Sequence, residues 1–269
     1  GMVLGLDKQP GTGDMFAELA RYYDPIMLHV DYGRWRRVAA ALADHLPRPL
    51  RHLDAACGTG VFLDAVFPCG WQSVGVDLSP AMLAAARSRD RHHPYAVADL
   101  RALPFNGAFD LITCLFDSVN FLLDEADVAA AIADMGRALR PGGILYFDVI
   151  TERMVLDYFE GRTWSENNGR FNSSWTSSYD RRTRLSKTVV RVSSGAEGTI
   201  LERVYDLDFV GRAVKEAGLE LVAAMDADTF AAPGKKSTRV DFVVAKAPAE
   251  ALRKTWRHLQ ARLRFEESD

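Results

Sequence analysis

The sequence predicts an α/β protein with a mostly parallel sheet that carries helices on both faces. Short apolar runs alternate with longer amphipathic runs over residues 51–150, and strands joined by helices in this way lie parallel. A glycine-rich turn follows the first apolar run, and an aspartate lies in or at the end of each of the first three runs. Two more apolar runs, at residues 219–225 and 239–246, bring the expected core sheet to seven strands.

The first strand is expected at residues 53–56, and the turn after it contains Gly58 and Gly60. Glycine has no Cβ, so a ligand can touch the backbone there. The apolar pattern resumes at residue 61, which predicts a helix whose positive N-terminal end favours an anionic or lone-pair-rich ligand. The spacing differs from the dinucleotide motif G-x-G-x-x-G, because Leu63 stands in the place of the third glycine.

Asp54, Asp77 and Asp99 mark the ends of three successive predicted strands. The carboxyl ends of parallel strands meet at one edge of a sheet, where ligands bind, so we expect the three carboxylates to line one crevice. The carboxylate of Asp77 can accept hydrogen bonds from both hydroxyls of a ribose. Each aspartate alternatively serves as a turn or cap residue. After the second strand, Ser79 and Pro80 predict the cap and first turn of a helix.

The other elements follow from periodicity, caps and helix breakers. Helices are expected at residues 14–22, 31–46, 125–139, 151–160, 207–217 and 250–265, and further core strands at residues 73–77, 95–100, 109–116 and 144–150. Period-two alternation at residues 171–179, 185–192 and 199–207 predicts a small antiparallel sheet of about three strands, inserted before the last two core strands.

Composition limits the function classes. The net charge of −3 argues against a general polyanion binder. No apolar run is long enough to span a membrane and no secretory leader is recognisable, so we expect a soluble cytoplasmic protein. The three cysteines have the spacing of neither a metal site nor a disulfide framework, and we expect no metal. The basic helix at residues 250–265 is expected to pack on its own domain, although such a helix can also contact RNA.

Residues 53–60 read L-D-A-A-C-G-T-G and resemble the first motif, L-D-x-G-C-G-T-G, of the class I S-adenosylmethionine (SAM)-dependent methyltransferases. The run L-R-P-G-G-x-L-x-F-D at residues 139–148 is also typical of that family. The resemblance implies a Rossmann-like fold, SAM as cofactor and S-adenosylhomocysteine as product. It assigns Asp54 to the amino group of the methionine part, Asp77 to the ribose and Asp99 to the adenine.

Residues 23–35 resemble the lead-in Y-D-x-L-M-x-D-V-x-Y-x-x-W of a bacterial subgroup of the family, from which Ile26 and His29 depart. The resemblance implies that this segment folds over the cofactor, where aromatic rings attract a sulfonium cation. The aromatic residues can instead form an ordinary helix-face core. The candidate cofactor contacts are Tyr23, Tyr32, Trp35, Asp54, Ala56, Gly58, Gly60, Asp77, Leu78, Met82, Asp99, Leu100, Leu115 and Phe116.

Asp117 and Asn120 follow the fourth strand, at the edge where a methyl acceptor would meet the sulfonium. We expect Asp117 to orient or deprotonate the acceptor, and Asn120 to hydrogen-bond the acceptor or the cofactor. Both residues are alternatively loop caps. Because SAM already carries its leaving group, no serine or cysteine nucleophile is needed.

The lead-in, the D-S-x-N sequence at residues 117–120 and the inserted sheet together are similar to small-molecule N-methyltransferases. The expected partner is therefore a small-molecule acceptor with an amine nitrogen. Membrane and nucleic-acid partners are not expected, and the inserted sheet is a candidate homodimer face. Two alternatives stay open: methylation of tRNA or rRNA, and a noncatalytic domain that binds SAM or another adenosine ligand.

The chain is expected to divide into five parts. They are a helical lead-in or lid (1–46), a SAM-binding core (47–150), an inserted substrate-covering element (151–206), the completion of the core sheet (207–248) and a terminal amphipathic helix (249–269).

Overall fold

The computed structural model describes residues 17–26, 31–89 and 92–266. The start of the predicted first helix, residues 14–16, lies outside the described residues, as do Met27, Leu28, His29 and Val30 of the lead-in motif. The described part of that helix, α1 (Ala20–Ile26), ends slightly beyond its predicted end. A proline disfavours helical geometry in the residue before it without forbidding it, and Pro25 lies inside α1.

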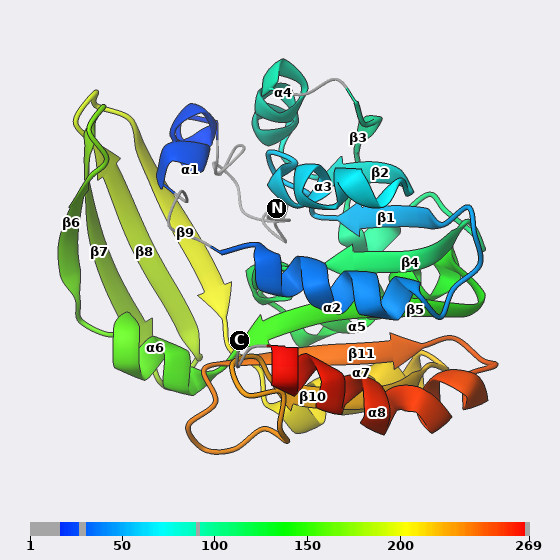
Figure 1. Ribbon diagram of the computed structural model, residues 1–269. Coiled ribbons are helices and arrows are strands. Elements are labelled where there is room, and N and C mark those ends of the chain that lie inside the picture. The colour runs from blue at the N-terminus through cyan, green and yellow to red at the C-terminus, as the bar shows by residue number, and fades with distance from the viewer. Residues whose placement is uncertain (1–16, 27–30, 90–91, 267–269) are drawn as a thin grey trace.

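Seven strands form one sheet in the order β10-β11-β5-β4-β1-β2-β3 (Figure 1). They are β1 (Arg51–Ala55), β2 (Gln72–Asp77), β3 (Tyr95–Val97), β4 (Phe109–Cys114), β5 (Leu139–Ile150), β10 (Glu220–Asp226) and β11 (Arg239–Ala245). The first five pair in parallel, and β10 and β11 close the sheet in antiparallel pairing. The predicted mostly parallel seven-stranded sheet is confirmed.

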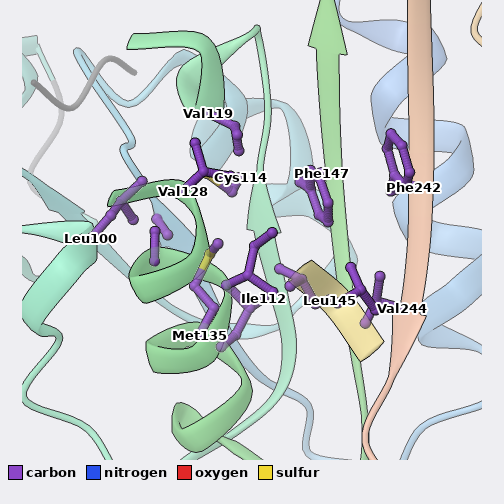
Figure 2. Close-up of a cluster of buried hydrophobic side chains, with 14 of the residues drawn as sticks. Leu100, Ile112, Cys114, Val119, Val128, Met135, Leu145, Phe147, Phe242 and Val244 are labelled. Atoms are coloured by element: carbon purple, nitrogen blue, oxygen red, sulfur yellow. The ribbon is translucent and has the colours of Figure 1, made fainter. Parts of the chain in front are cut away.

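Helices cover both faces of this sheet (Figure 1). They are α2 (Gly33–Ala43), α3 (Val61–Val66), α4 (Pro80–Arg89), α5 (Glu125–Ala138), α7 (Leu207–Glu216) and α8 (Glu250–Glu266). The buried side chains of α5 and α7 join one apolar cluster, and those of α2, α3 and α8 join another. Figure 2 shows the first cluster, in which Val128 and Met135 of α5 face Ile112 and Leu145 of the sheet.

Among the core strands, the third and the fifth differ most from the sequence prediction. The third strand ends at Val97, because Asp99 instead caps a short 3-10 turn at Leu100–Ala102. The fifth strand begins directly after α5, at Leu139, although its pairing with β4 is irregular until Ile144. The regular part of β5 is therefore the part that the apolar run predicted.

The inserted sheet has four strands, in the order β6-β7-β8-β9, so the prediction of about three is wrong. They are β6 (Thr163–Asn167), β7 (Asn172–Asp180), β8 (Leu185–Val192) and β9 (Glu197–Arg203), and α6 (Glu152–Tyr158) precedes them. The missed strand, β6, is short, and its pairing includes Trp164 opposite Trp175, whose rings stack at 5.7 Å. Such a cross-strand contact stabilises a strand without leaving a local sequence signal.

The inserted sheet lies beyond the carboxyl ends of the parallel strands, at the left of Figure 1. The carboxyl end of β9 returns to the core, where the side-chain amide of Asn120 donates a hydrogen bond to the carbonyl of Arg203 at 3.0 Å. The insertion is thus attached to the edge of the sheet that is expected to bind ligands. Its use as a homodimer face stays a prediction.

The terminal helix α8 packs on the domain, as its pattern predicts. Leu252, Trp256, Leu259 and Leu263 are all buried in the cluster that includes α2. Among the helices of the described residues, none combines the length and apolar character needed to cross a membrane.

Phe242 is expected to be a main determinant of stability. Its ring stacks on that of Phe147 at 5.0 Å, and both side chains are almost fully buried. Phe242→Ala should lower the free energy of unfolding by about 3–5 kcal/mol, because it removes a large buried ring and leaves a cavity. Phe265→Ala is the control, because Phe265 is 76% exposed. Equal urea midpoints for the two variants would contradict this account of the core.

Candidate active site

The turn between β1 and α3 is tightly wound. Ala56, Gly58 and Gly60 all have positive φ angles, of 60°, 56° and 80°. Glycine adopts this region without strain, whereas a residue with a Cβ pays roughly 1–2 kcal/mol. Ala56, which replaces the motif's first glycine, therefore has a strained backbone, although its side chain is small.

Tyr95, on β3, closes over this turn. A Cβ on Gly60 would collide with the hydroxyl of Tyr95. A Cβ on Gly75, in β2, would lie 2.8 Å from side-chain carbons of both Leu63 and Tyr95. Glycine at these two positions lets the turn, α3 and β3 pack closely together.

Asp77 joins the turn to the second strand. Its carboxylate accepts hydrogen bonds from the backbone N–H groups of Gly58 and Ser79, each at 2.9 Å, and the residue is fully buried. The hydroxyl of Ser79 accepts a bond from the N–H of Met82 at 3.1 Å, which confirms the predicted helix cap. The contact between Asp77 and ribose stays a prediction.

The third predicted acid, Asp99, is held by Arg101. The guanidinium contacts both carboxylate oxygens, the shortest distance being 2.6 Å. Burial tends to raise the pKa of Asp99, but hydrogen bonds from Arg101 outweigh it and lower the pKa, so the side chain is ionised. The next residue, Leu100, is fully buried in the core.

Asp54 ends a buried chain of hydrogen bonds across β1, β4 and β2. The hydroxyl of Thr113 donates to Asp54 at 2.8 Å, so its oxygen is free to accept from Nε2 of His52, also at 2.8 Å. Nδ1 of His52 then accepts from the hydroxyl of Ser73 at 2.8 Å. Burial lowers the pKa of His52 to about 3 and raises that of Asp54 to about 7. His52 and Thr113 are not among the site residues that the sequence predicts.

The predicted aromatic contacts separate into two groups. Tyr32 and Trp35 both pack edge-on against Phe116, with ring centroids 4.9 and 4.8 Å apart. Leu115, beside them, is also buried. Tyr23 instead packs with Met82 in a separate apolar cluster, which Leu78 and Phe121 also join. The structure therefore brings Tyr32 and Trp35 to the end of β4 and Tyr23 to the start of α4.

Asp148, near the carboxyl end of β5, is the centre of a charge cluster at the ends of β4 and β5. It is fully buried and accepts from the N–H groups of Phe116 at 2.9 Å and Asp117 at 2.6 Å. The indole N–H of Trp35 donates to it at 3.0 Å, and Nη1 of Arg239 donates at 2.7 Å. Asp148 is the aspartate of the family-typical F-D sequence at residues 147–148. It is not among the predicted site residues, although this motif marks it in the sequence.

Arg239, on β11, lies between Asp148 and Asp117. Its two terminal nitrogens lie 3.2 Å from Oδ1 of Asp117. Burial disfavours the cation, but the two carboxylates outweigh it and raise the pKa of Arg239. A second ion pair, between Arg34 of α2 and Asp241 of β11, lies close by.

Glu202, on β9, completes the cluster. Its Oε2 atom is buried, and within the described part of the chain no hydrogen-bond partner reaches that atom. Burial raises the pKa of Glu202 well above its ordinary value, and the charge of Asp117 and a side-chain hydrogen bond with it raise the pKa further. Burial also raises the pKa of Asp241 to about 7. We define the charge cluster as the carboxyls of Asp117, Asp148, Glu202 and Asp241 with the guanidinium groups of Arg34 and Arg239.

Residues 53–143 match the model of a family described as a methyltransferase domain. A demethylmenaquinone methyltransferase of Thermus thermophilus is 41% identical over 142 residues, which are 49% of this chain and 62% of the relative. A dTDP-3-amino-3,6-dideoxy-alpha-D-glucopyranose N,N-dimethyltransferase of Streptomyces fradiae is 32% identical over 137 residues, which are 49% of this chain and 53% of the relative. The chain thus spans less than two thirds of the length of these curated relatives.

A solved structure extends the likeness to most of the chain. SAM-bound CalS10, an amino pentose methyltransferase from Micromonospora echinaspora, aligns with a TM-score of 0.65 and 26% identity, covering 84% of this chain and 95% of that chain. The chain belongs to the class I SAM-dependent methyltransferases.

The donor set of this methyltransferase fits SAM. Asp54 and Asp77 come from two neighbouring parallel strands, Asp99 follows the next one, and the three offer carboxylates for an ammonium, a ribose and an adenine amino group. The individual assignments stay predictions. Among the described residues, no three His, Cys, Asp or Glu side chains gather as metal ligands.

The side chain of Asn120 bonds to two backbone segments of this methyltransferase. It is fully buried, its Nδ2 donates to the carbonyl of Arg203 and its Oδ1 accepts from the N–H of Ile150 at 2.9 Å. These bonds hold β9 against β5. The expected contact of Asn120 with acceptor or cofactor stays a prediction.

Gly60→Ala should weaken SAM binding. The new Cβ strains the backbone and displaces Tyr95, so the turn that contacts the cofactor must shift. Gly107→Ala is a matched control, because Gly107 also has a positive φ, of 57°, but a Cβ there meets nothing within 4 Å. Calorimetry should show SAM affinity reduced about tenfold or more in Gly60→Ala only. Equal SAM affinities in both variants would contradict the importance of the turn.

Asp54→Asn should change how stability depends on pH. The folded-state pKa of Asp54 is about 7, against an ordinary pKa of 3.8, so the folded protein holds a proton that the unfolded chain releases between these pH values. Raising the pH through this window lowers the stability of the wild type by a contribution that the variant lacks. The variant should therefore gain at least about 1 kcal/mol relative to wild type between pH 4.5 and pH 8.

The measurement is urea unfolding at both pH values without cofactor. Asp228→Asn serves as the control, because Asp228 is exposed and its substitution should leave the pH dependence unchanged. If Asp54→Asn and wild type differ by the same amount at both pH values, Asp54 does not titrate in this window.

Proposed function

We propose that the protein transfers the methyl group of SAM to the amine nitrogen of a small-molecule acceptor. The observation that carries the proposal is the composition of the charge cluster, which holds four carboxyls and two guanidinium groups. A ligand that brings a positive charge reduces this imbalance, whereas a phenolate or carboxylate ligand increases it.

The cluster is in the right place for the acceptor. SAM supplies an electrophilic methyl group, and the acceptor atom must approach it to roughly 3 Å in line with the bond to sulfur. The cofactor acids lie in β1, at the end of β2 and just after β3, and the charge cluster comes from the loop after β4, from β5, β9 and β11 and from α2, at the same edge. An acceptor held there by Asp117 would stand beside the cofactor.

Asp117 is suited to orient an ammonium. The ion pair with Arg239 and the bond from the backbone N–H of Asp117 to Asp148 fix the side chain of Asp117, which is 18% exposed. The rings of Tyr32, Trp35 and Phe116 pack beside the cluster and reduce the water around it. A charge–charge contact gains strength when water is excluded.

The relatives support more than one acceptor class. The Streptomyces fradiae relative is an N,N-dimethyltransferase of an amino deoxy sugar, and CalS10 is an amino pentose methyltransferase. The Thermus relative is instead a demethylmenaquinone methyltransferase. The excess of carboxyls over guanidinium groups in the charge cluster favours an amine acceptor.

A panel of acceptors tests the proposal. Purified protein with SAM should methylate tyramine, histamine or glucosamine at nitrogen more than about tenfold faster than 4-ethylphenol or phenylacetate, because the cluster repels the anionic forms of the last two. Mass spectrometry locates the methyl group, and S-adenosylhomocysteine formation gives the rate. Methylation of 4-ethylphenol or phenylacetate without an amine product would overturn the assignment to nitrogen.

A further inference from the structure

We propose that Glu202, carried by the inserted sheet, is the catalytic base of this enzyme: with Asp117 it binds the acceptor amine and takes its proton. This inference rests on the proposed amine methylation and assigns a step of it to a named residue. The insertion then supplies a reacting group as well as a cover.

The structure holds Glu202 in a fixed position. The next residue, Arg203, donates from its guanidinium to the carbonyl of Leu123 at 3.0 Å and accepts from Asn120 at its own carbonyl. Tyr205, two residues further along the chain, donates its hydroxyl hydrogen bond to the carbonyl of Leu122. These contacts fasten the carboxyl end of β9 to the loop after β4, which also carries Asp117.

The charges around Glu202 leave it without a cation of its own. The groups that act on it are Asp117 from the loop after β4, Asp148 from β5 and Arg239 from β11, as far as the described residues extend. Both terminal nitrogens of Arg239 are already bonded to Asp117 or Asp148. Glu202 therefore keeps its proton, in a side-chain hydrogen bond with Asp117, and within the described residues no partner reaches its buried Oε2.

Glu202 differs from Asp117 in its contacts with cations. Both terminal nitrogens of Arg239 lie 3.2 Å from the carboxylate of Asp117. Among the described residues Glu202 has no such contact, and burial raises its pKa well above the ordinary value. A base works best when its proton affinity approaches that of the group it deprotonates, so Glu202 is better matched to an amine.

The proton and electron balance is complete. The ammonium form of the acceptor binds between the two carboxyls, and its positive charge expels the resident proton of Glu202 to water. The carboxylate of Glu202 then takes one proton from the ammonium, which frees the nitrogen lone pair. That pair forms the bond to the methyl carbon while the electrons of the carbon–sulfur bond stay on sulfur. The products are a methylated ammonium, neutral S-adenosylhomocysteine and the one proton released to water.

Glu202→Gln tests this role, because the amide matches the shape of the protonated acid and should fold normally. Its SAM affinity should equal that of wild type, and its kcat/KM for tyramine at pH 7 should fall about 100-fold. The loss should shrink as pH rises, because more of the amine is then already deprotonated. Glu197→Gln is the matched control on the same strand, where Glu197 forms an exposed ion pair with Arg191.

These measurements distinguish failure of the proposed function from failure of the role of Glu202. If wild type methylates oxygen acceptors only, the proposed function fails. If wild type methylates tyramine at nitrogen and Glu202→Gln keeps both its rate and its pH profile, only the role of Glu202 fails.

Infrared spectroscopy gives a readout that does not depend on turnover. At pH 7 the wild type should show a protonated-carboxyl band that Glu202→Gln lacks and Glu197→Gln keeps. Methylammonium chloride, but not sodium chloride, should reduce this band in wild type, because the bound cation expels the proton. A band that is identical in wild type and Glu202→Gln would overturn the proposal.

Discussion

The buried ion pair between Arg239 and Asp148 connects the separate parts of this protein. Asp148 also binds the indole of Trp35 from the lead-in and the backbone of the loop after β4. Arg239 belongs to the last core strand and faces Asp117, beside which the insertion places Glu202. Removing Arg239 would leave the buried carboxylate of Asp148 without this cation, and breaking a buried pair in this way typically costs about 3–5 kcal/mol. The lead-in and the core therefore meet at this contact, beside the end of the insertion.

The strand order separates cofactor binding from acceptor binding along a single edge. The acids expected to hold SAM lie in β1, at the end of β2 and just after β3, and the charge cluster lies in the loop after β4, on β5, β9 and β11 and on α2. Because β1 and β4 are neighbours, the two sets of groups meet at the ends of this central pair of strands. This arrangement lets the two ligands approach each other without any change in the core.

Several acids of the site are buried at a cost to stability. The pKa values of Asp54 and Asp241 are raised to about 7, and that of Glu202 is also raised, in each case first by burial. A carboxyl that is poorly solvated in the empty site gains more from a cationic ligand than an exposed one does. The same burial that weakens the unliganded fold thus strengthens the attraction for SAM and for an amine.

The sequence by itself determined the parallel sheet, the strained glycine turn, the Ser79 cap and the inserted antiparallel sheet, because each depends on neighbouring residues and short periodic patterns. It also placed Asp54 and Asp77 at the edge of the sheet. Only the tertiary structure decided the roles of Asp148, Arg239 and Glu202 and the backing of Asp54 by His52. The order of the strands and the return of β9 to the core bring these groups together. Contacts between residues so far apart in the sequence leave no pattern among neighbouring residues.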